Sequence, residues 1–189
     1  MTRILIAYGT RHGQTKRIVD EMTSALEAAG HNVARCNLRR AEPDPLHAYD
    51  GVLVAASVHV GGYEREVRRW VREHVAEIDA MPNAFVSVSL SAANNDPQSV
   101  AETDAVVQKF CDGTGWHPDR VTRFAGALVY SKYNWLLKRI MRNIVRKQEQ
   151  GRYTDMTRDY NFTDFDEVRE FARRFGFFVR ESDGAMTGV

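Results

Sequence analysis

Short apolar runs alternate along the chain with longer segments in which apolar residues recur every three or four positions. The apolar runs lie at residues 3–8, 32–38, 51–57, 84–90 and 121–130. The first of them shows no polar alternation, which is typical of a strand buried on both faces of a parallel sheet. The segments with helical spacing lie at residues 13–29, 67–78, 100–110 and 164–178.

This alternation predicts an α/β protein with a parallel sheet and helices on both faces. Five strands fit the order 2-1-3-4-5, although alternation by itself also permits a Rossmann order. At 189 residues the chain suits one well-buried core. We expect a single domain over residues 1–179, with an insertion at residues 131–162 after the fifth strand. A frayed polar tail is expected at residues 180–189.

The composition argues against several classes of protein. No apolar run approaches the roughly 20 residues of a membrane span, and the first residues do not read as a secretory signal. Cys36 and Cys111 lie far apart, which argues against a disulfide scaffold and a thiolate metal site, and no histidine spacing suits zinc. We therefore expect a cytoplasmic protein without a bound metal.

The first strand is followed by the loop Gly9-Thr-Arg-His-Gly-Gln-Thr15, where the first helix begins. In an open α/β sheet ligands bind beyond the carboxyl ends of the strands, and a helix N-terminus attracts a phosphate. The candidate phosphate ligands are Thr10, Arg11, His12, Gly13, Gln14 and Thr15. The loop is not a P-loop, because Gln14 follows Gly13, and it lacks the GxGxxG dinucleotide motif. An ordinary polar turn is the alternative.

The ends of the third and fourth strands lie on the same edge of the predicted sheet. Their glycines and backbone N–H groups suit a flat ring such as a flavin. The candidate ring-binding residues are Ser57, Val58, His59, Val60, Gly61, Gly62, Ser89, Leu90, Ser91, Ala92, Ala93 and Asn94. His59 and Tyr63 are candidates to border the ring, and His59 is a candidate proton donor to flavin N5. The alternative for Tyr63 is that it packs on its own helix.

A basic segment interrupts the pattern between the fifth strand and the last helix. Residues 132–152 contain seven cations and one anion, whereas the whole chain has a net charge of +1. Apolar residues fall at helical spacing within residues 133–145, which predicts a cationic amphipathic helix. Residues 132–149 would contact an anionic membrane surface, or the helix would pack on the domain or on a second subunit of a homo-oligomer. The near-neutral total charge gives nucleic-acid binding little support.

Further stretches of the chain are distinctive when taken together. They are residues 10–15, Tyr49-Asp50, Ala56-Ser57 with Gly61 and Tyr63, Met81-Pro82, Ala84-Phe85, Trp116 with Pro118-Asp-Arg120, Ala125-Gly-Ala-Leu128 and Thr163-Asp164. In these residues the chain resembles the flavodoxin-like family of menaquinone-dependent protoporphyrinogen IX dehydrogenases. It differs from the family pattern at His59-Val60, in the loop at residues 91–96 and at Val129.

The resemblance implies a flavodoxin-like fold with one FMN, held by the loop at residues 10–15 and the two neighbouring loops. It implies that the flavin takes a hydride equivalent at N5 from a porphyrinogen and passes electrons to menaquinone, in heme biosynthesis. Because a porphyrinogen gives up its electrons in several two-electron steps, the flavin would turn over repeatedly on one substrate. A flavodoxin-type electron carrier and a cofactor-free adaptor on the same fold remain alternatives.

Overall fold

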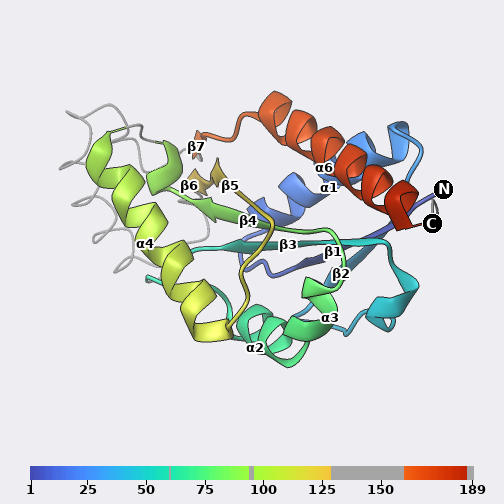
Figure 1. Cartoon of the computed structure of the whole chain (residues 1–189). Coiled ribbons are helices and arrows are strands. Elements are labelled where there is room, and N and C mark those ends of the chain that lie inside the picture. Colours follow the sequence, from blue (N-terminus) through green and yellow to red (C-terminus); the bar gives the residue numbers. More distant parts are fainter. Residues whose placement is uncertain (60, 94–95, 129–159, 187–189) are drawn as a thin grey trace.

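Five parallel strands form the central sheet of the protein (Figure 1). The computed structural model describes residues 1–59, 61–93, 96–128 and 160–186. The strands are β1 (Arg3–Tyr8), β2 (Asn32–Asn37), β3 (Gly51–Ser57), β4 (Asn83–Ser89) and β5 (Arg120–Ala125). Their order, β2-β1-β3-β4-β5, confirms the predicted sheet. The three central strands are almost entirely buried, whereas the two edge strands are partly exposed.

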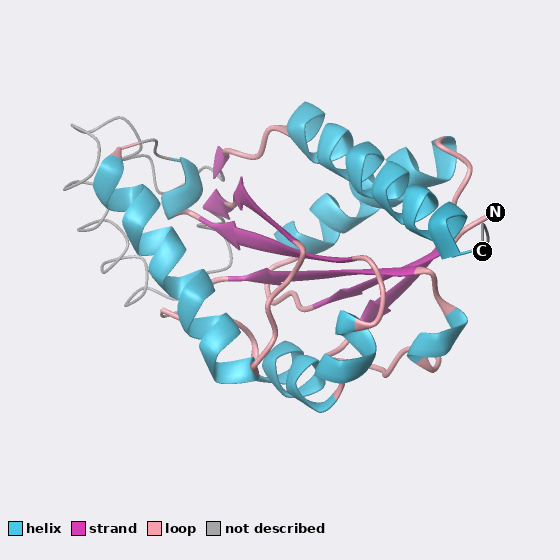
Figure 2. Cartoon of the chain, viewed as in Figure 1, coloured by secondary structure: helices cyan, strands magenta, loops and turns pink. Residues whose placement is uncertain are grey.

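Helices cover both faces of the sheet (Figure 2). One face carries α1 (Gln14–Ala28) and α6 (Phe165–Met186), and the other carries α2 (Arg65–Glu73), α3 (Val75–Asp79) and α4 (Pro97–Thr114). Two short 3-10 turns, η1 (Leu46–Ala48) and η2 (Ser91–Ala93), lie in connections. Side chains of a strand alternate between faces. Ile4 and Ile6 therefore lie in the core under α1 and α6, while Leu5 lies in the core on the other face.

Two helices, α2 and α3, replace the single helix predicted at residues 67–78. The break lies at His74, whose φ of −122° and ψ of 17° leave the helical region. His74 Nδ1 donates to the carbonyl oxygen of Trp70 at 2.8 Å, and the two rings stack with centroids 5.0 Å apart. The backbone N–H of His74 also donates to the Trp70 carbonyl oxygen at 3.1 Å, so α2 closes its last turn at His74, and the dihedral angles of this residue redirect the chain into α3.

The fifth strand ends at Ala125 and not at residue 130 as predicted. Ala125 pairs with Ser89, the last residue of β4, so β5 has no parallel neighbour beyond this point. After Gly126, β6 (Ala127–Leu128) instead pairs antiparallel with β7 (Tyr160–Asn161). The two ends of the insertion are therefore joined by a short ribbon of their own.

Helix α6 continues to Met186, well beyond its predicted end at residue 178. Val179 is fully buried, and Arg180 donates to the carbonyl oxygen of Ala29 at 2.6 Å. These contacts make the segment predicted as a frayed tail helical as far as Met186. Helix α4 is also longer than predicted, because Asp96 caps its start and Gly115 ends it in the left-handed conformation.

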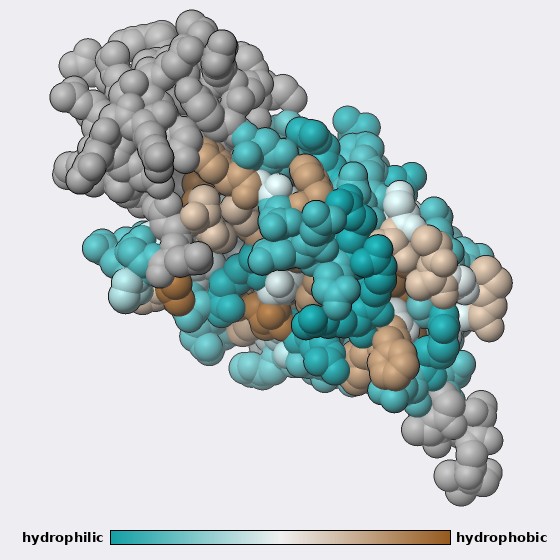
Figure 3. Space-filling model, turned by 90° about the horizontal axis from the view of Figure 1, so that it is seen from above, coloured by the Kyte–Doolittle hydropathy of each residue, from teal (hydrophilic) through white to brown (hydrophobic). Residues whose placement is uncertain are grey.

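The basic segment at residues 132–152 and its predicted amphipathic helix lie outside the described residues. None of the helices that the structure describes is long and apolar enough to cross a bilayer. The face formed by α1 and α6 is largely hydrophilic, with apolar side chains in small separate patches (Figure 3).

Candidate functional site

The loop after β1 forms a tight turn at the start of α1. Gly9 N–H continues the sheet by donating to the Ala55 carbonyl oxygen at 3.0 Å. The Thr10 hydroxyl then accepts from Gly13 N–H at 3.0 Å, and Arg39 donates to the Thr10 carbonyl oxygen at 3.0 Å. Gly13 has a φ of +92°, which a side chain would strain. Glycine is therefore required where this turn becomes a helix.

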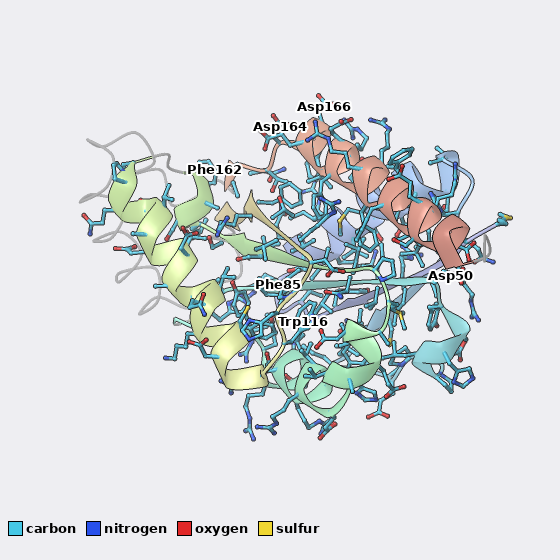
Figure 4. All side chains as sticks on the ribbon, viewed as in Figure 1. Asp50, Phe85, Trp116, Phe162, Asp164 and Asp166 are labelled. Atoms are coloured by element: carbon cyan, nitrogen blue, oxygen red, sulfur yellow. The ribbon has the colours of Figure 1, made fainter. Side chains whose placement is uncertain are left out.

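The N-terminus of α1 is left open, unlike those of the other two long helices. Asp96 caps α4, and Asp164 caps α6 by accepting from two backbone N–H groups. Asp164 and Asp166 both lie at the start of α6 (Figure 4). No described side chain caps α1, and its first turn contains no acidic residue. The free N–H groups and the positive end of the helix dipole at this position attract an anion.

Thr15 gives the clearest sign that a ligand belongs in this turn. Its side chain is fully buried, and its hydroxyl has no hydrogen-bond partner among the described residues. A buried polar group without a partner costs about 1–3 kcal/mol, so such groups are rare unless a ligand or water satisfies them. An anion at the N-terminus of α1 would accept from this hydroxyl and remove the cost.

Gln14 ties the turn to a distant part of the chain. Its amide nitrogen donates to Asn161 Oδ1 at 2.8 Å and to the Thr163 hydroxyl at 2.7 Å. Thr163 in turn donates to the Ala125 carbonyl oxygen at 2.6 Å. Both amide hydrogens of Gln14 are thereby used, so its side chain supports the turn, and its backbone N–H remains as the donor for a ligand. Sequence reasoning missed this link, which joins the ends of β5 and β7 to α1.

The loop after β3 folds back on itself beside the first loop. Val58 N–H donates to the Val88 carbonyl oxygen at 2.8 Å, and His59 and Gly62 exchange two backbone hydrogen bonds of 2.7 and 3.2 Å. The His59 ring meets the His12 ring edge to face, with centroids 5.6 Å apart. The two loops therefore meet at the carboxyl edge of the sheet. Arg11 is exposed in the first loop, and Val60 lies outside the described residues.

A buried carboxylate, Glu64, lies beneath these loops. Its side chain is 0% exposed, its Oε1 accepts from the Ser57 hydroxyl at 3.0 Å, and the same oxygen lies 3.4 Å from His59 Nε2. His59 Nε2 lies 3.0 Å from the Ser57 hydroxyl. Glu64 Oε2 has no partner among the described residues. In the sequence Glu64 begins a charged stretch and reads as a solvated surface residue, which is why it was missed.

The charge state of Glu64 follows from these partners. Burial by itself raises the pKa of Glu64, but the hydrogen bonds from His59, Ser57 and the Glu64 backbone, together with the charge of His59, outweigh burial and lower the pKa. Glu64 is therefore ionised at neutral pH, and its Oε1 is an acceptor beside the Ser57 hydroxyl and His59 Nε2.

Gly9 makes room for Glu64. A Cβ atom at Gly9 would lie 2.6 Å from Val67 Cγ2 and 3.2 Å from Glu64 Cδ. Only glycine permits this approach without a shift of the neighbouring side chains, so the carboxylate is held directly under the first loop.

Replacing Glu64 with glutamine is expected to lower the free energy of unfolding by about 1–2 kcal/mol at pH 7, because a charged hydrogen-bond acceptor is lost. The lowered pKa means that the ionised form stabilises the fold above the ordinary carboxyl pKa and that this contribution disappears as the pH falls through the folded-state pKa. Urea unfolding of the FMN-free proteins should therefore show a difference that is constant from pH 7 down to the ordinary carboxyl pKa of 4.5 and that shrinks as the pH is lowered further.

The matched control for this substitution is Glu77→Gln, at an exposed position of α3. It should have little effect on unfolding at either pH. A Glu64→Gln difference that stays constant with pH would show that the charge of Glu64 does not stabilise the fold.

The loop after β4 is the third of the candidate loops at the carboxyl edge of the sheet. The Ser89 hydroxyl accepts from Ala92 N–H at 3.2 Å, and Ala93 N–H donates to the Leu90 carbonyl oxygen at 3.1 Å. Ser91 begins the short turn η2, and Asn94 lies outside the described residues. The loops after β1, β3 and β4 thus lie at one edge of the sheet, where the strand order requires them (Figure 1).

The expectation that Tyr63 borders a flavin ring is wrong. The Tyr63 ring packs edge to face on Phe85 and Phe110, with centroids 5.1 and 5.0 Å away, and its hydroxyl lies 2.7 Å from the Ser87 hydroxyl. Burial raises the pKa of Tyr63 to about 12, although the hydrogen bond with Ser87 opposes the shift. Tyr63 therefore belongs to the core between β4 and α4 and not to its own helix or to the loop surface.

Solved structures match this fold at low sequence identity. The Flv1 flavodiiron core from Synechocystis sp. PCC6803 has a TM-score of 0.58 and 12% identity, covering 96% of this chain and 36% of that one. Rubredoxin oxygen:oxidoreductase from Desulfovibrio gigas has a TM-score of 0.52 and 10% identity, covering 96% of this chain and 37% of that one. The chain thus spans little more than a third of either protein. An archaeal flavodoxin has a TM-score of 0.50 and 10% identity, covering 94% and 99%.

Sequence comparisons identify the family of the chain more narrowly than the similarity of fold does. Residues 5–157 match the family model described as Flavodoxin domain. Protoporphyrinogen IX dehydrogenase (quinone) from Escherichia coli strain K12 is 33% identical over 171 residues, which cover 90% of this chain and 93% of the relative. The protein of the same name from Leishmania major is 35% identical over 176 residues, which cover 92% of this chain and 74% of the relative. The chain therefore belongs to the flavodoxin-domain family and, within it, to the family of the protoporphyrinogen IX dehydrogenases (quinone).

Proposed function

We propose that this protein is an FMN-dependent oxidoreductase that dehydrogenates protoporphyrinogen IX and passes the electrons to a quinone. Relatives with this name match the chain over nearly its whole length. The observation that carries the proposal is the buried Thr15 hydroxyl, which has no partner among the described residues and lies at the start of α1, a helix that no described side chain caps. A phosphate is the ligand that such a turn accepts best, and FMN carries one.

Three loops would hold FMN. The phosphate would lie against residues 10–15, where the Thr15 hydroxyl and the backbone N–H groups of the first turn of α1 donate and Arg11 adds positive charge. The ring would lie between residues 57–62 and 89–94. When bound, FMN supplies the two-electron redox chemistry, and the protein supplies binding, orientation and electrostatics.

His59 is the residue best placed to hold a proton near the ring. Its Nε2 lies 3.0 Å from the Ser57 hydroxyl and 3.4 Å from Glu64 Oε1, so these two residues fix the orientation of the imidazole. We therefore propose His59 as the proton donor at the edge of the site, with Glu64 as its positioning residue.

Two further parts of the proposal, contact with a membrane and contact with a second copy of the chain, rest on the amphipathic pattern of the sequence. A membrane-dissolved quinone would be reached more easily by a cytoplasmic protein whose residues 132–149 contact an anionic bilayer surface. The same amphipathic pattern would serve equally in a contact with a second copy of the chain.

The test is a visible spectrum followed by an anaerobic assay. The purified protein, supplied with FMN, should be yellow and should convert protoporphyrinogen IX to protoporphyrin only when a menaquinone analogue is present. A yellow protein without turnover would be an electron carrier. A protein that stays colourless after FMN is added would contradict the assignment of FMN as the cofactor.

A further inference from the structure

A groove lined by cations runs between α2 and α4. It has a volume of about 720 Å³, and four arginines of α2 and Lys109 of α4 line it, with Glu66 as the one carboxylate among its described lining residues. Arg65, Arg68, Arg69 and Arg72 are spaced three and four residues apart, so they share one face of α2. The volume lies within the range of small-molecule sites. We call this feature the cationic groove.

Most cations of the cationic groove have no counter-ion among the residues that the structure describes. Arg69 lies 3.9 Å from a Glu42 oxygen and 3.8 Å from a Glu73 oxygen. Within the described ranges, no ion pair or side-chain hydrogen bond involves the other three arginines or Lys109. Like charges three or four residues apart repel each other and destabilise a helix. An anionic ligand would relieve this repulsion.

The cationic groove continues towards the loop after β3. Arg68 and Lys109 also line a smaller cavity of about 280 Å³. Its other walls include Gly61 of that loop and the apolar side chains of Val106 and Phe110. The pair of cavities therefore has a cationic end on α2 and a partly apolar end beside a loop that we assign to the flavin ring.

The geometry points to the cationic groove as the site that binds the carboxylate groups of the tetrapyrrole substrate. This inference rests on the proposed function. Protoporphyrinogen IX joins an apolar macrocycle to two propionates. The joined cavities likewise have a partly apolar end and a cationic end. The macrocycle would lie at the Gly61 end, near the flavin loop, and the propionates would reach the guanidinium groups, which bind carboxylates in bidentate fashion.

The test uses FMN-loaded protein and protoporphyrin IX, a stable probe with the same two propionates. Binding is followed by quenching of tryptophan fluorescence in wild type and in the double variant Arg68→Gln/Arg72→Gln. The matched control, Arg173→Gln/Arg174→Gln, removes two cations from α6 on the opposite face of the sheet. The dimethyl ester of protoporphyrin IX, which has no carboxylates, serves as the second probe.

The groove variant should bind protoporphyrin IX at least about tenfold more weakly than wild type, since two charged contacts are lost. It should bind the ester as wild type does, and its KM for the porphyrinogen should rise more than its kcat falls. The control should match wild type with both probes. Unchanged porphyrin affinity and KM in the groove variant would overturn this assignment while leaving the proposed function in place. A wild-type protein that neither binds the porphyrin nor oxidises the porphyrinogen would instead overturn the proposed function.

Discussion

Replacing Thr15 with valine is expected to weaken FMN binding by about 10- to 100-fold, because a hydrogen bond to a charged phosphate contributes about 1.5–3 kcal/mol. The same substitution should leave the FMN-free protein as stable as wild type or more stable. Valine has nearly the shape of threonine, and it replaces a buried hydroxyl that has no partner among the described residues. This one substitution is therefore expected to lower the affinity for FMN without lowering the free energy of unfolding of the FMN-free protein.

Fluorescence titration with FMN and urea unfolding of the FMN-free protein measure the two effects. Thr23→Val is the matched control, because Thr23 lies in the same helix and is also buried, but its hydroxyl donates to the Val19 carbonyl oxygen at 2.8 Å. The control should lose a little stability and keep its FMN affinity. If Thr15→Val binds FMN as tightly as wild type does, Thr15 is not a phosphate ligand.

Replacing Trp116 with alanine is expected to lower the free energy of unfolding by about 3–5 kcal/mol, the usual cost of removing a large buried aromatic side chain. Trp116 is 0% exposed, and its Nε1 donates to Asn83 Oδ1 at 3.1 Å. Its ring meets those of Phe85 and Phe110 edge to face, with centroids 5.8 and 6.3 Å away. Trp116 and Phe85 lie close together in the interior (Figure 4).

Urea unfolding again provides the measurement. Phe177→Ala is the comparison, because the Phe177 side chain on α6 is 61% exposed and should cost little when truncated. A loss of less than about 1 kcal/mol in Trp116→Ala would mean that the core under α4 does not depend on this ring.

The parts of the fold that are set by continuous local patterns could be predicted from the sequence. The strands at residues 3–8 and 51–57 are predicted to the residue, because each is an apolar run buried on both faces. The turn at residues 9–15 is recognisable because a glycine-containing loop separates a strand from a helix. Boundaries set by a local change of backbone conformation or by distant contacts are missed, as at His74 and at Arg180.

The candidate site, like the fold, could be predicted from the sequence only in part. Its backbone framework follows from strand order, but the roles of Glu64 and Gln14 depend on contacts that no local pattern reveals. Gln14 binds Thr163, which is 149 residues away in the sequence. Glu64 differs from the solvated glutamates near it because its side chain is fully buried, where Gly9, from another strand end, leaves space for its carboxylate.

The link between Gln14, Asn161 and Thr163 has a thermodynamic consequence. The same side chains support the turn proposed for the phosphate and the strand that ends the insertion. If a partner of the insertion displaces Asn161 or Thr163, the turn loses its support and cofactor affinity falls. By linkage, cofactor binding must then weaken the affinity for that partner by an equal factor. Binding at the cofactor site and binding at the insertion would therefore oppose each other.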